Sequence, residues 1–313
     1  MVRTHMSGPH PKKIVLVVGP TASGKTGLSL DLAEAFNGEL VNADSVQFYR
    51  GFDIGSCKPT AKELTRAHHH LIDALDPNDP CDAGRFVRLA DEAIANITSR
   101  GKLPIVVGGT GLYFRALVHG LTEIPPIAPE VRQRVLDEVA EGGPEAAHDR
   151  LTQVDPVAAE RIAPTDRQRI SRALEVYDQT GRALSEFQEK HRFAERRYEA
   201  LGLAIKWPRE QLHERIGRRV GMMLDDGFVA EVRTLLAAGH SASLRPMRSL
   251  GYREMVEHLT KGVSLEQTLE AIARGHRQYA KRQRTWFRKH DEVHWLPPEG
   301  TKRAIELVRD FTA

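Results

Sequence analysis

The sequence predicts an α/β fold: a P-loop core with a mainly parallel, doubly wound sheet, joined to a helical insertion domain. Three observations carry this prediction. Short β-branched runs alternate with helical patterns before Leu121, and a glycine-rich phosphate-binding pattern follows the first run. Beyond Leu121 the strand signals stop, and they return near Ala200.

The composition is that of a folded, water-soluble protein. Hydrophobic residues make up 41% and charged residues 28% of the 313 residues, enough to form a packed core. No apolar run approaches the ~18 residues of a membrane-spanning helix, and the N-terminus lacks an apolar signal-peptide core. Cys57 and Cys81 have no metal-ligand spacing and favour a reducing compartment. We therefore expect a cytoplasmic monomer with no membrane partner.

The first half of the chain reads as strands that alternate with helices. Strands are expected over 12–20, 38–45, 68–75 and 103–111, the third being the weakest. Helices are expected over 24–36, stopped by Asn37-Gly38, and over 83–101. Such alternation indicates a parallel sheet with helices on both faces.

A proline-rich joint, TEIPPIAP, separates this half from a segment without strong strand signals. Helices are expected there over 129–143, 143–155, 155–162 and 166–181. Strand character returns over 200–208, and helices then lead to a last short strand over 292–298. The predicted organisation is a disordered tail (1–12), a core made of 13–124 and 199–313, and a helical insertion (125–198).

The stretch GPTASGKT matches the phosphate-binding pattern G-x-x-x-x-G-K-[ST], between a predicted strand and a predicted helix. Its glycines let backbone amides face phosphate oxygens, Lys25 adds a positive charge, and the Thr26 hydroxyl can hold Mg²⁺. The pattern predicts binding of a di- or triphosphate, and it specifies neither adenine nor a third phosphate. No convincing Walker B strand follows, because PIVVGG ends in Gly108-Gly109-Thr110 and not in aspartate.

Asp44 ends the second predicted strand, at the edge where doubly wound folds bind ligands. A carboxylate there can accept a proton from a nucleophile that attacks near the phosphate chain. Asp44 could equally cap the next segment or hold Mg²⁺ indirectly. Ser45, Gln47 and Tyr49 could read a base edge or serve only as turn residues. On these residues alone, a small-molecule P-loop kinase explains the pattern as well.

Several stretches between Ile14 and Trp295 together resemble one family, the tRNA dimethylallyltransferases (tRNA isopentenyltransferases). The P-loop by itself is unspecific, but DS-x-Q-x-Y, GGTGLY and AKRQ-x-T-W in this order are highly specific. The matching stretches are GPTASGKT (19–26), NADSVQFYRGFDIGSCKP (42–59), HHHLID (68–73), VVGGTGLYFRAL (106–117), DRQRISRALEV (166–176), SLGYREM (249–255) and RQYAKRQRTWFR (277–288).

The resemblance implies transfer of a dimethylallyl group from dimethylallyl diphosphate to N6 of the adenosine 3′ of the anticodon, adenosine 37 of tRNA. Diphosphate would be released, Mg²⁺ would be the cofactor, and the anticodon stem-loop would be the macromolecular partner. The P-loop would then hold a prenyl diphosphate in place of ATP. The chain ends at Ala313 with no cysteines near the end, which resembles the short bacterial form of the family.

By this resemblance Asp44 takes the proton from N6, Thr110 hydrogen-bonds near the reacting centre, and Arg219 neutralises the departing diphosphate. Arg215 and Arg218 are the alternatives to Arg219. The reaction suits this set, because a purine amine is a poor nucleophile and diphosphate leaves readily once its charge is met. The diphosphate-binding residues would be Gly19, Pro20, Thr21, Ala22, Ser23, Gly24, Lys25 and Thr26, with Thr26 also holding the metal.

The resemblance also implies a set of tRNA-binding residues, some of them in the insertion. The target adenosine must leave its stack to reach the site. Without the resemblance, the basic stretch RQRISR would read as a solvated helix face. The implied residues are Asp44, Ser45, Val46, Gln47, Thr110, Arg132, Gln168, Arg169, Ile170, Ser171, Arg172, Arg248, Ser249, Leu250, Gly251, Tyr252 and Arg253.

The most basic segment, RGHRQYAKRQRTWFRKH, predicts a helix with one positively charged face. That face can bind RNA phosphates or the diphosphate. The alternative is a solvated face with no ligand, and the net charge of +3 does not distinguish the two. Trp286 and Phe287 read as core residues. The residues of the charged face are Arg274, Arg277, Lys281, Arg284 and Arg288.

The triplet of His68, His69 and His70 could suggest a metal site. Adjacent residues on a strand point to opposite faces, so packing and hydrogen bonds in a loop are the preferred interpretation. Three rival functions also stay open at this point: a prenyltransferase acting on free AMP or ATP, a P-loop kinase, and a tRNA-binding module without catalysis.

Overall fold

The computed structural model describes residues 12–122, 124–191 and 196–313. Most of the expected disordered tail lies outside these residues, but the Lys12 carbonyl accepts a hydrogen bond from the Glu199 amide (3.1 Å). The chain forms two compact units, one from residues 1–118 and 196–313 and the other from residues 119–195. No helix in the described part is long and apolar enough to cross a membrane.

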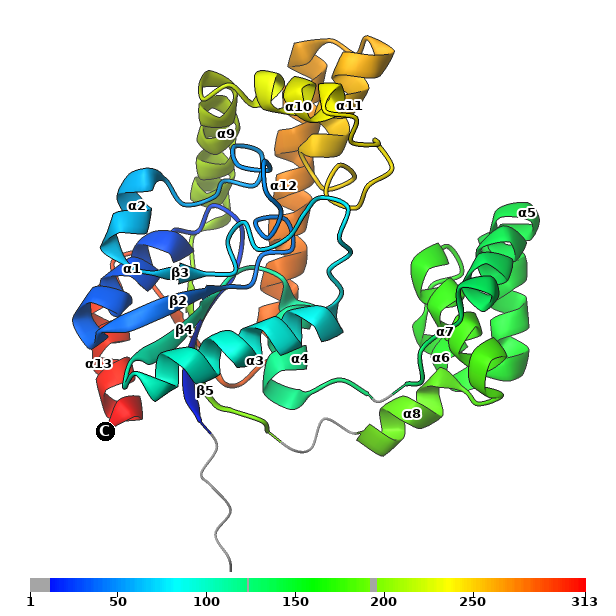
Figure 1. Cartoon of the computed structure of the whole chain (residues 1–313), viewed down its shortest axis with the longest axis horizontal. Coiled ribbons are helices and arrows are strands. Elements are labelled where there is room, and N and C mark those ends of the chain that lie inside the picture. Colours follow the sequence, from blue (N-terminus) through cyan, green and yellow to red (C-terminus); the bar gives the residue numbers. More distant parts are fainter. Residues whose placement is uncertain (1–11, 123, 192–195) are drawn as a thin grey trace, which may run out of the picture. The chain divides into compact units, whose positions relative to one another are not determined.

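The larger unit is built on a six-stranded, wholly parallel sheet in the order β3-β2-β4-β1-β5-β6 (Figure 1). This confirms the predicted α/β fold. β3 is much shorter than the expected strand over 68–75, because Leu71 and Asp73 have positive φ angles (65° and 53°) that extended strands do not allow. The strands are β1 (Lys13–Val18), β2 (Gly38–Asn42), β3 (His69–His70), β4 (Leu103–Val107), β5 (Glu199–Ile205) and β6 (Val293–Leu296).

The central strand β1 serves two separate cores. Ile14, Leu16 and Val18 belong to the larger core, whereas Val15 and Val17 belong to the smaller one. Alternate side chains of a strand point to opposite faces, so a strand covered on both faces needs a continuous apolar run. The run IVLVV meets this requirement, and each of its residues is at most 3% exposed.

Helices cover both faces of this sheet, which confirms the doubly wound arrangement (Figure 1). α1 and α13 contribute buried residues to the smaller core, and α3, α4, α9, α10, α11 and α12 contribute to the larger one. The helices are α1 (Lys25–Phe36), α2 (Ala61–Arg66), α3 (Ala83–Ser99), α4 (Gly111–His119), α9 (Arg209–Asp225), α10 (Phe228–Ala237), α11 (Tyr252–Lys261), α12 (Leu265–Phe287) and α13 (Thr301–Thr312).

The smaller unit, residues 119–195, is helical where it is described. It has its own core, in which Val135 and Leu151 pack against Ile170 and Leu174. The two helices expected over 129–143 and 143–155 are confirmed: they meet at Gly143, whose backbone is non-helical (φ 82°), and together form the element α5. The helices are α5 (Pro129–Val154), α6 (Pro156–Arg161), α7 (Arg167–Thr180) and α8 (Leu184–His191).

Candidate active site

The C-terminal ends of three neighbouring strands bring the predicted catalytic groups to one edge of the sheet. β1 leads into the P-loop, β2 leads to Asp44, and β4 leads to Thr110. β4 lies between β1 and β2, although β2 precedes it in the chain. β1 therefore marks the point where the strand order reverses, and doubly wound folds bind their ligands at such a point.

The P-loop has the backbone conformation of a phosphate cradle. Gly19 (φ 121°) and Gly24 (φ 94°) lie in a region that side chains rarely allow, which explains the two glycines of the motif. The Thr21 amide donates to the Gln283 side-chain oxygen of α12 (2.9 Å). The sequence analysis assigned no role to Gln283, although it lies in the AKRQ stretch. The hydroxyl of Ser23 is buried and has no partner among the described residues.

The side chain of Lys25 folds back onto the P-loop, where its ammonium group donates a hydrogen bond to the Pro20 carbonyl (2.6 Å). Burial and, to a smaller extent, the charge of Arg219 lower the pKa of Lys25 to about 7, while the charge of Asp44 opposes both. Lys25 forms no ion pair with any described residue. Its positive charge is therefore available to an anion that enters the cradle.

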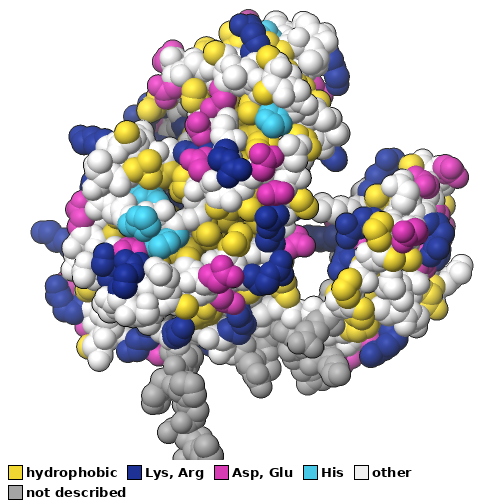
Figure 2. All heavy atoms as spheres, in the orientation of Figure 1, with side chains coloured by type: hydrophobic (Ala, Val, Ile, Leu, Met, Phe, Trp, Pro, Cys, Tyr) yellow, Lys and Arg dark blue, Asp and Glu magenta, His cyan; other side chains and the backbone are white. Residues whose placement is uncertain are grey.

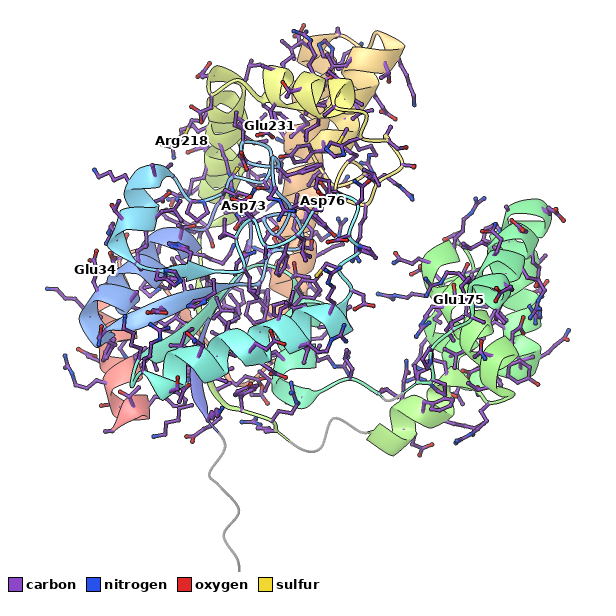
Figure 3. The ribbon with its side chains drawn as sticks, in the orientation of Figure 1. Glu34, Asp73, Asp76, Glu175, Arg218 and Glu231 are labelled. Carbon is purple, nitrogen blue, oxygen red and sulfur yellow. The ribbon has the colours of Figure 1, made fainter. Side chains whose placement is uncertain are left out.

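Two of the three arginines weighed for the diphosphate contact the P-loop. Arg219 donates through Nη1 to the Thr21 hydroxyl (3.2 Å), and Arg215 donates through Nε to the Ala22 carbonyl (2.8 Å). They lie four residues apart on α9, so they share a helix face. Arg218 lies on another face and is exposed (Figure 3). The geometry supports Arg219 and retains Arg215, while Arg218 has no contact with the loop.

Asp44 is fixed by hydrogen bonds to its backbone and to its side chain. The buried Asn42 amide accepts from the Asp44 N–H (3.0 Å) and donates to the Leu71 carbonyl (3.1 Å). Asp44 Oδ1 accepts from the Val46 N–H (2.9 Å), which leaves Oδ2 for another partner. Asn42 is a positioning residue that the sequence analysis missed, since its side chain acts through tertiary contacts.

The glycine pair after β4 lets the chain pass close to the backbone at Ala43 and to helix α12. A Cβ at Gly108 would lie 2.5 Å from the Ala43 carbonyl carbon, and one at Gly109 would overlap the Gln283 amide. The following residue, Thr110, has a buried hydroxyl that lies near the Tyr279 hydroxyl of α12. A buried hydroxyl beside the P-loop is suited to bind a polar group of a ligand.

The segment after Asp44 is clamped by a carboxylate of α10. Glu231 accepts hydrogen bonds from three successive backbone amides, those of Asp53 (3.0 Å), Ile54 (2.6 Å) and Gly55 (3.1 Å). It also accepts from the Tyr252 hydroxyl (2.6 Å). Glu231 thus joins the loop to α10 and α11, and no sequence motif identified it.

The same segment is fastened from within. The Lys58 ammonium pairs with Asp73 and donates to other oxygens of the loop, and its side chain is only 6% exposed. Gln47 donates both of its amide hydrogens to the carbonyls of Ser56 (3.1 Å) and Cys57 (3.0 Å). Gln47 can therefore offer a base only its carbonyl oxygen, which narrows the expected role of this residue.

The predicted tRNA-binding turn over 248–253 is exposed only in part. Arg248 and Arg253 lie on the surface, and Ser249 and Leu250 are half-buried. Tyr252 is 0% exposed, and Gly251 is buried as well. The Tyr252 side chain packs in the larger core and donates to Glu231, and the contact of this residue with tRNA stays a prediction.

The predicted tRNA-binding segment of α7 is divided in the same way. Ile170 (0% exposed) and Ser171 (5%) are buried, because they face the core of the smaller unit. Their contact with tRNA stays a prediction. Arg172 pairs with the buried Glu175 (3.3 Å). The exposed side chains of this predicted set are those of Arg132, Gln168 and Arg169.

The basic face of α12 is only partly solvated. Arg274, Lys281 and Arg288 are exposed, whereas Arg277 and Arg284 are half-buried. Phe287 is 2% exposed and Trp286 packs against the larger core, as predicted. On the face of the protein seen in Figure 2, Lys and Arg side chains are interspersed with Asp and Glu side chains.

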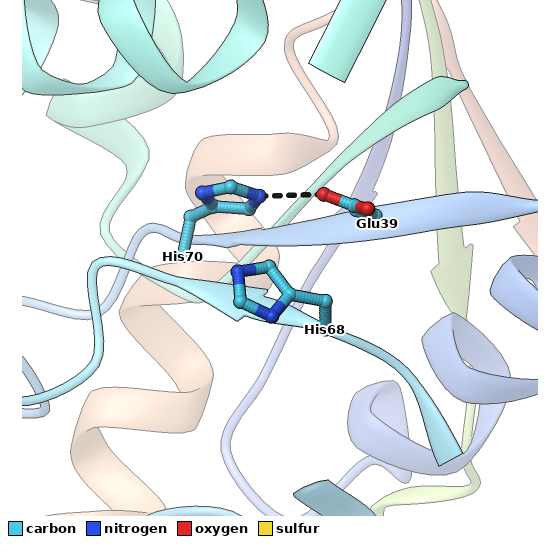
Figure 4. Close-up of side chains that lie close together, drawn as sticks. All are labelled: Glu39, His68 and His70. Atoms are coloured by element: carbon cyan, nitrogen blue, oxygen red, sulfur yellow. Dashed lines mark hydrogen bonds and ion pairs between the residues drawn. The ribbon is translucent and has the colours of Figure 1, made fainter. Parts of the chain in front are cut away.

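Two of the three histidines share a face of the sheet with a carboxylate (Figure 4). One ligand atom each from Glu39, His68 and His70 lies within 4.8 Å of the others. Because side chains along a strand alternate between its two faces, only the middle histidine, His69, points away from this cluster. Glu39 Oε1 and Oε2 each accept from Arg100 at 2.6 Å, and Oε1 also accepts from Lys102 (2.7 Å). These cations meet the carboxylate's charge and would repel a divalent ion, so we interpret the cluster as an ion-pair network at the sheet edge.

A P-loop flanked by two cations, with a carboxylate at the neighbouring strand end, places the chain among the P-loop α/β proteins. The IPP transferase family matches residues 47–290, and the isopentenyl transferase family matches residues 12–77. The chain belongs to the IPP transferase family. This confirms the resemblance found in the motifs.

Individual relatives are similar over nearly the whole chain. The tRNA dimethylallyltransferase 1 of Pelobacter propionicus is 50% identical over 93% of this chain and 94% of the relative. The tRNA isopentenylpyrophosphate transferase of Bacillus halodurans is 35% identical, with a TM-score of 0.71 and 96% of each chain covered. A eukaryotic dimethylallyltransferase acting on tRNA is 29% identical, with a TM-score of 0.83, covering 96% of this chain and 79% of the other.

Proposed function

We propose that this protein transfers a dimethylallyl group from dimethylallyl diphosphate to N6 of adenosine 37 in tRNA, as a monomer in the cytoplasm. One observation carries the proposal: a P-loop with two unpaired cations, Lys25 and Arg219, lies beside the carboxylate of Asp44. The identity of 50% to a named tRNA dimethylallyltransferase supports the acceptor.

The donor's diphosphate would bind to the amides of the P-loop, and Lys25 and Arg219 would meet its charge. The donor set fits Mg²⁺, because the Thr26 hydroxyl at the start of α1 makes no hydrogen bond to another described residue and Mg²⁺ prefers oxygen ligands. When bound, Mg²⁺ would neutralise charge on the leaving diphosphate. Arg215, which holds the Ala22 carbonyl, would keep the cradle in shape.

The proposed chemistry is a displacement at the allylic carbon. The N6–carbon bond forms as the carbon–oxygen bond to the diphosphate breaks, and the electron pair of that bond leaves with the diphosphate. The proton of N6 passes to Oδ2 of Asp44, while the Val46 N–H holds Oδ1. The buried hydroxyl of Thr110 would donate a hydrogen bond near the reacting centre.

The tRNA would be held through exposed basic and polar side chains of both units. In the larger unit these are Arg248 and Arg253, and in the smaller unit Arg132, Gln168 and Arg169. Contacts of this kind with phosphates release counterions, so the affinity for tRNA should fall steeply with salt. Tyr252 and Ile170 would support these surfaces from the core beneath.

The test is an assay with three arms, each with purified protein and Mg²⁺. The arms contain unmodified tRNA with dimethylallyl diphosphate, AMP with the same donor, and tRNA with ATP. Nucleosides from the digested products are analysed by mass spectrometry. A dimethylallyl mass gain on adenosine 37 in the first arm alone supports the proposal. A gain on AMP alone indicates a mononucleotide prenyltransferase, and phosphate transfer without prenylation indicates a kinase.

A further inference from the structure

His276 of α12 is a buried polar side chain that the proposed reaction leaves without a role. Both ring nitrogens are buried, and neither has a hydrogen-bond partner among the described residues. Buried polar groups in folded proteins are nearly always hydrogen-bonded, and each one left unbonded costs about 1–3 kcal/mol. An imidazole with two free, buried nitrogens therefore indicates a place where a ligand or water binds.

Helical spacing places His276 on the face of α12 that contacts the P-loop and the end of β4. Tyr279 and Gln283 follow it at positions i+3 and i+7, one and two turns along the helix. Gln283 accepts from the Thr21 amide and donates to the Gly109 carbonyl, both at 2.9 Å. This face of α12 thus lies against the P-loop and the end of β4, and His276 extends it by one turn.

Two charged groups act on His276, one from each helix that packs beside α12. Burial and, to a smaller extent, the charge of Arg219 on α9 lower the pKa of His276 to about 4, with Glu254 of α11 opposing them. The Glu254 carboxylate is already engaged, since it accepts from the Gly251 amide (2.8 Å) and pairs with Arg253. The imidazole is consequently neutral at neutral pH, and it can donate one hydrogen bond and accept another.

Arg219, which acts on His276 and also contacts the P-loop, is the group that favours an anionic ligand here. Arg219 donates to neutral partners, the Thr21 hydroxyl (3.2 Å) and the Cys57 sulfur (2.7 Å), and Lys25 donates to a carbonyl. Neither cation has a carboxylate ion-pair partner in the described part of the chain. Two uncompensated cations in a partly desolvated crevice stabilise a multivalent anion between them.

We propose that His276 is a further binding residue for the diphosphate of the donor, to which it donates a hydrogen bond beside Arg219. The inference rests on the proposed function, because it takes the anion of the crevice to be a diphosphate. Because the acceptor is an anion, a hydrogen bond from the neutral imidazole to the diphosphate is charge-assisted. Tyr279, on the same helix face, would stay unionised, since burial raises its pKa to about 12.

The test is titration calorimetry with inorganic pyrophosphate in the presence of Mg²⁺, using the full chain. His276→Ala should raise the dissociation constant of pyrophosphate roughly 10-fold or more, the loss expected for one charge-assisted hydrogen bond. His276→Asn keeps an amide donor and should recover part of the affinity. Gln278→Ala changes an exposed position of the same helix and should leave the affinity unchanged. The affinity for tRNA should be the same in all variants.

Each contrary outcome has a distinct meaning. Equal pyrophosphate affinity in the wild type and in a folded His276→Ala variant, judged by thermal unfolding, overturns the inference. A loss of tRNA affinity without a loss of pyrophosphate affinity also overturns it, since His276 would then face the acceptor. If His276→Ala unfolds, the His276→Asn variant takes its place. Wild-type pyrophosphate affinity together with altered tRNA affinity in that variant also overturns the inference. The two proposals can fail separately. If the wild type transfers dimethylallyl to tRNA but His276→Ala binds pyrophosphate normally, the inference about His276 is wrong and the proposed function stands.

Discussion

Removal of the Glu231 carboxylate tests how firmly the loop that begins at Asp44 is held. Glu231 accepts four hydrogen bonds of 2.6–3.1 Å, three from backbone amides of residues 53–55 and one from Tyr252. These bonds are partly exposed, so each contributes about 1 kcal/mol to the free energy of unfolding. We expect Glu231→Ala to lower that free energy by roughly 3–4 kcal/mol, and Glu231→Gln, which keeps one carbonyl oxygen, by about half as much.

The measurement is equilibrium unfolding in urea, followed by tryptophan fluorescence. The matched control is Glu257→Ala on α11, which removes an exposed carboxylate that pairs with Lys261 (3.1 Å) four residues on. Such a pair contributes about 0.3–0.5 kcal/mol, so the control should be nearly silent. Transfer activity is measured on the same samples, and the two Glu231 variants should lose rate in the same order as stability.

The result that would refute this reasoning is a loss for Glu231→Ala as small as that for Glu257→Ala. The loop would then be held mainly by Lys58, whose ammonium pairs with Asp53 and Asp73. A large loss of stability with an unchanged transfer rate would show that the clamp supports the fold and does not position Asp44.

Three further predictions concern the crevice. Asp44→Ala should keep tRNA binding and lose transfer; equal losses of affinity and rate would mean that Asp44 positions the base. Lys25→Gln should weaken pyrophosphate binding most below pH 7, because above its pKa of about 7 the wild-type Lys25 is neutral and must take up a proton on binding. A ratio of dissociation constants that stays constant from about pH 6 to about pH 9 contradicts this. Arg219→Ala should slow transfer roughly 100-fold, whereas Arg218→Ala, at an exposed position, should match the wild type; similar kinetics for the two variants would remove Arg219 from the site.

Local patterns sufficed to predict the framework of the protein. The run IVLVV is apolar at every position, so it predicts a strand buried on both faces, and the structure places it between two cores. The P-loop glycines predicted the turn, because Gly19 and Gly24 adopt positive φ angles. The position of Asp44 just after a strand could also be predicted, because the local sequence indicates where that strand ends.

Other features depended on tertiary structure, because the partners lie far apart in the chain. Gln283 orders the P-loop across 262 positions, and Glu231 clamps the Asp53 amide across 178. Whether Ile170 and Tyr252 face solvent or a core also followed from how their helices pack.

The sequence by itself determined the main strands and helices, the phosphate cradle, the family and the positions of Lys25 and Asp44, because these rest on local patterns and motifs. Only the tertiary structure selected Arg219 over Arg218, brought His276 and Gln283 to the crevice, and buried part of the predicted tRNA-binding set. The physical reason is that a helical residue's surroundings are decided by what packs against its face. That choice is made by the whole fold and leaves no periodic signal in the local sequence.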